Sequence, residues 1–169
     1  MATRSPRSEA MVRIAGMVMI VVVVTAAVTG CASAPATSSI PDAPVPPARY
    51  STTRSQIVNT ALKYVGAPYA RGGASPAGFD CSGFVMFVYG RAGVRLPHGA
   101  EAQYHLGLSV AREQLQPGDV VFFDRLRHSG IYIGDRRFIH ATKPGDAVKV
   151  SGLDEEWYRR RWVGARRLL

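Results

Sequence analysis

The sequence predicts an α+β domain in which one helix, beginning at a cysteine, packs on an antiparallel sheet. Helix-like patterns come first in the domain and short apolar strands follow, an order that is typical of this fold class. The central helix is indicated over 81–89, where Phe84, Val85, Phe87 and Val88 form a broad apolar stripe. Such a stripe suits a helix that is packed into a core.

The helical part of the domain is divided by glycine and proline. A helix is predicted over 54–65, because apolar residues recur there at i, i+1, i+4, i+5 and i+8. Gly66 and Pro68 end this helix, and the stretch 68–78 is a loop rich in glycine and proline. After the cysteine-bearing helix, a short helical piece is expected over 100–105.

The second part of the domain alternates short apolar runs with turns. The turn over 116–119 leads into the run Val-Val-Phe-Phe, which suits a buried strand. The predicted strands cover 120–123, 129–134, 137–141, 148–150 and 162–168, and a helical turn is expected over 154–160. These short strands indicate an antiparallel sheet.

The chain begins with the pattern of a bacterial export signal. Arg4, Arg7 and Arg13 make a positively charged start, or Arg13 alone does so if Met11 is the true first residue. The apolar segment 14–28 is shorter than the roughly 20 residues that a membrane-spanning helix needs. It suits a signal peptide, which is removed from the mature protein.

The predicted signal peptide, residues 1–30, ends in Val-Thr-Gly and is followed by Cys31, a sequence that resembles the lipobox of bacterial lipoproteins. The resemblance implies cleavage before Cys31 and attachment of acyl chains such as palmitate to that residue, so that the protein is anchored to a membrane. An ordinary signal with an accidental cysteine is the alternative. Residues 31–49 contain five prolines and form a linker, which leaves 50–169 as one domain.

A lipid on Cys31 would place the protein in the cell envelope. In a Gram-negative cell we expect the outer membrane, facing the periplasm, and otherwise the outer face of the cell membrane. The formal net charge of +9 then favours anionic neighbours such as lipid headgroups or carboxylate-rich wall polymers, and export argues against nucleic acid. The run Arg159-Arg160-Arg161 belongs to such a surface or is simply solvated, which is the commoner case.

Cys81 is the only thiol left in the domain if Cys31 carries the lipid. Exported proteins usually pair their cysteines, so a lone thiol indicates a reactive one. Asp80 is a good N-cap residue, which puts Cys81 in the first turn of the helix, where the helix dipole favours a thiolate. The alternative is a small buried residue with no chemical role.

Two histidines lie on neighbouring strands of the predicted sheet. The turn at Gly134-Asp135 makes a hairpin in which position 128 pairs near position 141, so His128 and His140 are cross-strand or diagonal neighbours. A thiol and two imidazoles meet the needs of nucleophilic catalysis. Cys81 would attack a carbonyl, His128 would act as base and then as acid, and His140 would orient His128. Structural histidines and a zinc site are alternatives, although the spacings match no known metal motif.

Four motifs, in order along the domain, resemble the NlpC family (also written NlpC/p-sixty) of papain-like cell-wall endopeptidases. They are Gly-Ala-Pro-Tyr with Gly-Gly over 66–73, Phe-Asp-Cys-Ser-Gly over 79–83, Gln-Pro-Gly-Asp-Val-Val-Phe-Phe over 116–123, and the two histidine strands over 128–141. The resemblance implies a papain-like fold. It also implies hydrolysis of peptide bonds in peptidoglycan stems by a monomer, with no metal and no cofactor.

The resemblance also implies roles for single residues. Cys81, His128 and His140 become nucleophile, base and orienting group. Tyr69 would lie beside the thiol and help the oxyanion or the substrate, unless it is a core aromatic. Asp80 and Ser82 would line the site, although Asp80 suits a simple cap as well.

Two positions depart from the family pattern. Arg71 stands where an aromatic residue is usual, and we expect it to bind a stem-peptide carboxylate. His98-Gly99 stands where the family has Arg followed by Thr or Ser. We expect His98 to be either a contact at the rim of the site or simply an exposed residue. A non-catalytic wall-binding lipoprotein on the same fold, and an amidase or acyl transferase, are the alternative functions.

Overall fold

The computed structural model describes residues 47–169, and side chains from residue 51 onward. The predicted signal peptide, Cys31 and almost all of the predicted linker lie outside the described residues, so those predictions are untested. Among the described helices, none is long and apolar enough to cross a membrane.

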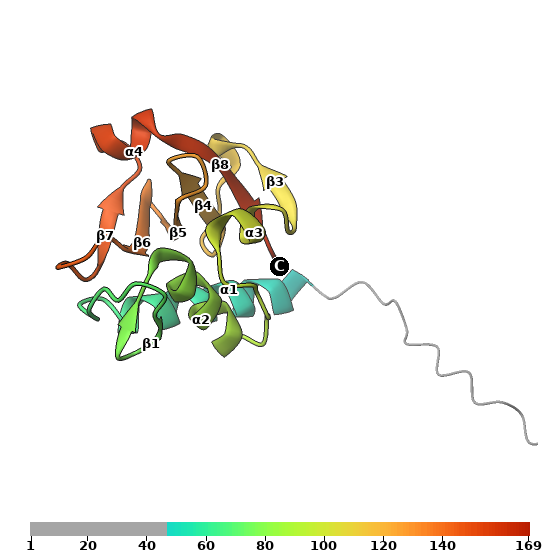
Figure 1. Cartoon of the computed structure of the whole chain (residues 1–169). Coiled ribbons are helices and arrows are strands. Elements are labelled where there is room, and N and C mark those ends of the chain that lie inside the picture. The colour runs from blue at the N-terminus through green and yellow to red at the C-terminus, as the bar shows by residue number, and fades with distance from the viewer. Residues whose placement is uncertain (1–46) are drawn as a thin grey trace, which may run out of the picture. The chain divides into compact units, whose positions relative to one another are not determined.

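Helices come first and strands follow, as Figure 1 shows. The helices are α1 (Pro47–Lys63), α2 (Cys81–Arg91), α3 (Ala100–Tyr104), the 3₁₀ turn η1 (Arg112–Gln114) and α4 (Glu156–Arg160). The strands are β1 (Ala74–Ser75), β2 (Gly78–Phe79), β3 (Leu108–Val110), β4 (Val120–Phe123), β5 (His128–Gly134), β6 (Arg137–Ala141), β7 (Val148–Gly152) and β8 (Trp162–Arg167). The predicted α+β class is confirmed.

The main sheet has six strands in the order β3-β8-β4-β5-β6-β7, and every neighbouring pair is antiparallel. The strands β4 to β7 follow one another through short turns, and β8 returns to pair with the outer side of β4. A separate two-stranded hairpin, β1–β2, leads directly into α2. The central position of β5 places His128 in the middle of the sheet.

The core forms on both faces of this sheet. On one face, α1 and α2 pack against buried side chains of β4, β5 and β6, and α2 contributes Phe84, Val85, Val88 and Tyr89. Each large apolar side chain that is buried in this way stabilises the fold by about 1.5–3 kcal/mol. The second, smaller cluster lies on the opposite face, toward α4, around Phe123. The sheet is therefore covered on both sides where it carries the histidines.

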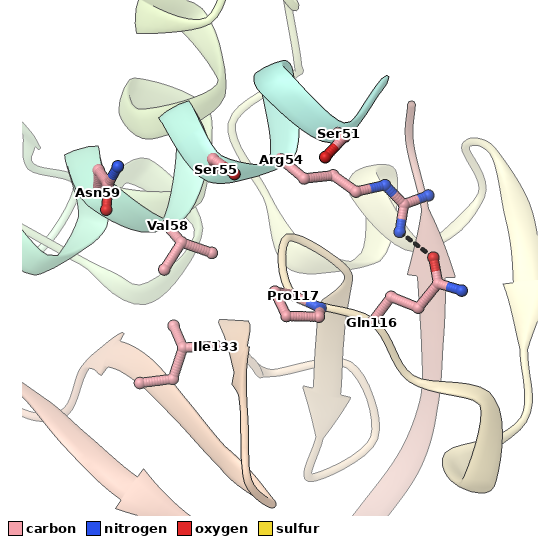
Figure 2. A pocket seen from close by; sticks show the side chains of 8 residues that line it. All are labelled: Ser51, Arg54, Ser55, Val58, Asn59, Gln116, Pro117 and Ile133. Carbon is pink, nitrogen blue, oxygen red and sulfur yellow. Dashed lines mark hydrogen bonds between the residues drawn. The ribbon is translucent and has the colours of Figure 1, made fainter. Parts of the chain in front are cut away.

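The helix α1 attaches the start of the domain to this sheet. Ile57 and Ala61 are fully buried in the core, while the Arg54 guanidinium donates a hydrogen bond to the Gln116 side chain. Figure 2 shows the hollow of about 460 Å³ that remains between α1 and the turn before β4. Its lining residues are Ser51, Arg54, Ser55, Val58, Asn59, Gln116, Pro117 and Ile133.

Apart from shifts of one or two residues at element ends and the short 3₁₀ turn η1, which was not predicted, three differences stand out. The first helix begins at Pro47, inside the predicted linker, because proline is tolerated in the first turn of a helix. The stretch 68–78 contains the hairpin β1–β2 instead of being a plain loop. The edge strand β3 was not predicted, since Leu108-Ser109-Val110 is too short to show an alternating pattern.

Candidate active site

The carboxylate of Asp80 organises the start of α2. One oxygen accepts hydrogen bonds from the Gly83 backbone N–H at 2.7 Å and from the Ser82 hydroxyl at 3.1 Å, so Asp80 is the predicted N-cap. The other oxygen accepts from the Gly72 N–H at 3.0 Å, and His98 Nε2 lies 2.9 and 3.0 Å from the two oxygens. Burial alone would raise the pKa of Asp80, but the Gly83 and His98 contacts outweigh it and hold that pKa below its usual value.

The two glycine motifs bring the loop before α2 against the helix. The backbone oxygen of Gly73 accepts a hydrogen bond from the Asp80 N–H at 2.9 Å. A Cβ atom on Gly83 would lie only 2.1 Å from that same oxygen, so no side chain fits there. This close approach fixes the first turn of α2, in which Cys81 is the first residue.

The thiol of Cys81 is partly buried and donates a hydrogen bond to the Arg127 backbone oxygen at 3.7 Å. Burial raises the pKa of this thiol, and the nearby Asp80 carboxylate raises it further. The backbone N–H groups of Ser129 and Ser82 and the Ser129 hydroxyl act in the opposite direction without cancelling the effect of burial. The burial of the thiol thus favours its protonated form, in the opposite direction to the helix dipole from which a thiolate was expected.

The imidazoles of His128 and His140 contact each other directly. His128 Nε2 lies 2.8 Å from His140 Nδ1, and both side chains are buried. The pairs Ile131–Ile139 and Tyr132–Phe138 set the register of the two strands, which makes the histidines diagonal neighbours, as the sequence predicted. Gly130 makes room for this contact, because a Cβ atom there would meet the Phe138 ring at 2.6 Å and the His140 Cβ at 3.0 Å.

The far side of His140 is held by two hydroxyl groups. His140 Nε2 lies 3.2 Å from Ser151 Oγ on β7 and 3.2 Å from the Tyr158 hydroxyl on α4. If His140 donates its Nε2–H to these oxygens, its Nδ1 accepts the Nε2–H of His128. The Nδ1 of His128 is then unprotonated and can accept a proton.

Both imidazoles are neutral at rest. Burial lowers the pKa of His128 to about 4, and burial together with the neighbouring His128 lowers that of His140 to about 2. The thiol hydrogen bond goes to the residue next to His128 and not to the imidazole itself. Hydrogen bonds between catalytic groups are often long without substrate and tighten in the complex.

The remaining predicted site residues lie around the thiol in different ways. Tyr69 is half-buried and bridges to Phe79, and burial followed by the nearness of Cys81 and Asp80 raises the pKa of its hydroxyl. Arg71 is exposed, and its charge acts on Tyr69 in the opposite direction. Ser82 is buried, and its hydroxyl donates a hydrogen bond to Asp80.

Sequence reasoning missed two contacts that support this site. His98 Nε2 contacts the Asp80 carboxylate, so His98 is not simply an exposed rim residue. Gln103 on α3 is fully buried, and its amide donates to the backbone oxygens of Ser82 and Pro97, both at 2.9 Å. No local sequence pattern predicts either contact, because both join segments that are distant in sequence. In the described part of the chain, no group of three His, Cys, Asp or Glu side chains is placed as metal ligands would be.

Comparison with known proteins identifies the family. The sequence model of the NlpC/P60 family matches residues 66–167, which is most of the described domain. This chain belongs to the NlpC/P60 family. The match covers all four motifs from which the resemblance was inferred, and it includes Cys81, His128 and His140.

Individual proteins and one solved structure are also similar to this chain. A protein named "probable endopeptidase" from Mycobacterium tuberculosis is 50% identical over 102 residues, which are 60% of this chain and 26% of the relative. The murein DD-endopeptidase MepH from Escherichia coli is 36% identical over 121 residues, covering 66% of this chain and 45% of MepH. The crystal structure of an NlpC/P60 family protein from Bacillus cereus superposes with a TM-score of 0.67 at 34% identity, over 69% of this chain and 40% of that one.

This chain therefore spans about a quarter to a half of the length of these relatives. The likeness is confined to the NlpC/P60 domain. The fold of that domain is shown by the solved structure, and its chemistry follows from the side chains described above.

Proposed function

We propose that this NlpC/P60 domain is a peptidoglycan endopeptidase that uses Cys81 as its nucleophile. One observation carries the proposal. The thiol at the start of α2 contacts the backbone of Arg127 and of Ser129, the two neighbours of His128, and the His128 imidazole is hydrogen-bonded to that of His140. Cysteine hydrolases need a nucleophile, a base near it and a group that orients the base, and these three residues can supply those roles. The names of the relatives, "endopeptidase" and "murein DD-endopeptidase", supply the substrate class.

The reaction uses groups whose resting state is neutral. His128 takes the thiol proton on Nδ1 while Sγ attacks the scissile carbonyl, and His140 stabilises the imidazolium that forms. The developing oxyanion is stabilised by backbone N–H groups in the first turn of α2 and by the Tyr69 hydroxyl. His128 then gives the proton to the leaving amine, and water hydrolyses the acyl-enzyme with His128 as base.

The proposal extends to the location of the enzyme. An acylated Cys31 followed by a proline-rich linker would hold the domain in the cell envelope, next to the peptidoglycan. The basic charge of the chain suits an anionic polymer as substrate.

Mass spectrometry of muropeptides tests the activity. We expect a protein comprising residues 32–169 to release new fragments from purified peptidoglycan, and the masses of the fragments identify the bond that is cut. The Cys81→Ala variant should release none. In the full chain, Cys31→Ala serves as the matched cysteine control and should keep the cleavage activity in detergent extracts. Identical fragments with and without the Cys81 thiol would contradict the proposal, and so would the absence of fragments from both proteins.

A further inference from the structure

A basic hollow of about 580 Å³ lies beside the candidate active site. It is formed by the turn between β4 and β5 together with the junction of α4 and β8. Four of its lining side chains are guanidinium groups, those of Arg125, Arg127, Arg160 and Arg161. The catalytic scheme above uses none of these side chains.

The hollow adjoins the nucleophile through Arg127. The backbone oxygen of Arg127 accepts the hydrogen bond of the Cys81 thiol at 3.7 Å, while its side chain lines the hollow. One residue of an extended peptide covers about 3.3–3.6 Å. The hollow and the thiol thus share Arg127, and a peptide residue next to a carbonyl at Sγ is the part of a substrate that would lie nearest to this arginine.

Trp157 connects the proposed base to Arg161, one of the arginines that line the hollow. The Trp157 ring lies 6.0 Å from the His128 ring, edge to face, and the Arg161 guanidinium lies 4.7 Å from the centre of the same indole. Trp157 remains 43% exposed, although it is a large aromatic residue next to a buried histidine. One indole therefore lies close to both His128 and the guanidinium of Arg161, which lines the hollow.

The turn that carries two of the arginines is held in an unusual conformation. Asp124, Arg125 and Leu126 have φ angles of 51°, 54° and 66°, three successive residues in the left-handed region. Such residues cost free energy and are found mainly where the surroundings fix them. Here Leu126 packs against the core, and the Asp124 N–H donates to the Arg161 backbone oxygen at 2.8 Å. The arginines are thus positioned before any ligand arrives.

Positive charge exceeds negative charge in this region. Asp124 is shared between Arg127 at 3.3 Å and Arg161 at 3.9 Å, and Arg160 pairs with Glu156 on its own helix. Within residues 51–169, Arg125 forms no ion pair. Four guanidinium groups therefore face two carboxylates, which leaves capacity for an anion.

We infer that this hollow is a substrate subsite that binds a free carboxylate of the stem peptide, on a residue adjacent to the scissile bond. The inference rests on the proposed function. A guanidinium group matches a carboxylate with two parallel hydrogen bonds. A stem peptide carries free carboxylates on its γ-linked glutamyl residue and its diamino acid, next to the bonds that such an enzyme can cut.

Synthetic stem peptides that differ only in one carboxylate test the inference. For each carboxylate, one peptide carries the free acid and its partner carries the carboxamide. For the wild-type protein we expect one of the amide peptides to raise KM about tenfold, the equivalent of one charge-assisted hydrogen bond, with kcat nearly unchanged. The Arg125→Gln and Arg161→Gln variants should have similar KM values for the acid and the amide peptide. Arg137→Gln, which removes an exposed arginine paired with Asp135 on another turn, should keep the wild-type preference.

Binding to the Cys81→Ala variant separates this inference from the proposed function. Calorimetric titration with the same peptides should show the preference for the acid even if the wild-type protein cleaves neither peptide. Cleavage with equal KM for every acid and amide pair would overturn the subsite and leave the endopeptidase intact. The Arg125 and Arg161 variants could instead lose affinity equally for every peptide and also bind more weakly to intact anionic wall polymer or to anionic vesicles. That result would show a different ligand and would also overturn the subsite.

Discussion

Ser129 affects the candidate nucleophile through two of its groups. Its backbone N–H and its hydroxyl both favour the ionised form of Cys81, and the hydroxyl is fully buried without another partner among the described residues. A buried hydroxyl that is left without a partner costs free energy. The thiolate that forms during catalysis can supply that partner.

We expect Ser129→Ala to raise the apparent pKa of Cys81, because a donor to the thiolate is lost. The rate of alkylation by iodoacetamide, measured across pH, reports this pKa. Ser109→Ala, an exposed change on β3, is the control. An unchanged profile in Ser129→Ala would show that the hydroxyl does not reach the thiol.

Tyr158 and Ser151 act on the reaction through His140. Both hydroxyls contact His140 Nε2, and where they accept its N–H they hold the tautomer that leaves His128 Nδ1 free. We expect Tyr158→Phe or Ser151→Ala to lower kcat by a few-fold and the double variant to lower it about tenfold, with KM unchanged and a shifted pH profile. Tyr64→Phe, a half-buried core change, should keep the wild-type profile. A double variant that loses thermal stability but keeps its kcat would limit both hydroxyls to a structural role.

At the scale of elements, the first turn of α2 depends on one carboxylate. Asp80 caps the helix, holds the loop at Gly72 and pairs with His98. We expect Asp80→Ala to lower the free energy of unfolding by about 1–2 kcal/mol, whereas Asp80→Asn keeps the cap and costs less. Urea unfolding measures both. Because its folded pKa is lowered, the contribution of Asp80 is present above its unfolded pKa and is lost as pH falls through the folded value. Equal losses in Asn and Ala would exclude the cap as the cause.

Several elements follow from local sequence and others do not. The strands β4 and β6 have their predicted bounds, and α2 begins after the predicted cap, because apolar runs and cap residues act locally. The hairpin β1–β2 could not be predicted, since its two-residue strands pair only once α2 and the glycine loop are in place. The histidine pair could be predicted from one turn. The basic hollow could not, because it joins the turn at 124–127 to residues 160–163.

For the whole molecule, the buried histidine pair makes stability depend on pH. Both folded pKa values lie below the ordinary value of 6.5, so the unfolded chain binds protons between pH 6.5 and 4 that the folded protein does not. Stability therefore falls as pH is lowered through this range, on the order of 3 kcal/mol from His128 alone. The carboxylates with lowered pKa values, such as Asp80 and Asp154, titrate below this window.

Thermal unfolding measured between pH 4 and 7 checks this dependence. We expect the melting temperature of the wild-type protein to fall with pH, and the double variant His128→Gln with His140→Gln to show a much flatter curve. His105→Gln, an exposed change, should follow the wild type. A double variant with the wild-type slope would place the titrating groups elsewhere in the protein.

The protonated state of Cys81 has a consequence for the lifetime of the protein. Peroxides attack thiolates much faster than thiols, and oxidation past the sulfenic acid is irreversible for most proteins. A nucleophile that stays protonated until a substrate arrives is thereby protected from oxidation between turnovers. The burial that raises the pKa of Cys81 would thus also slow its irreversible oxidation.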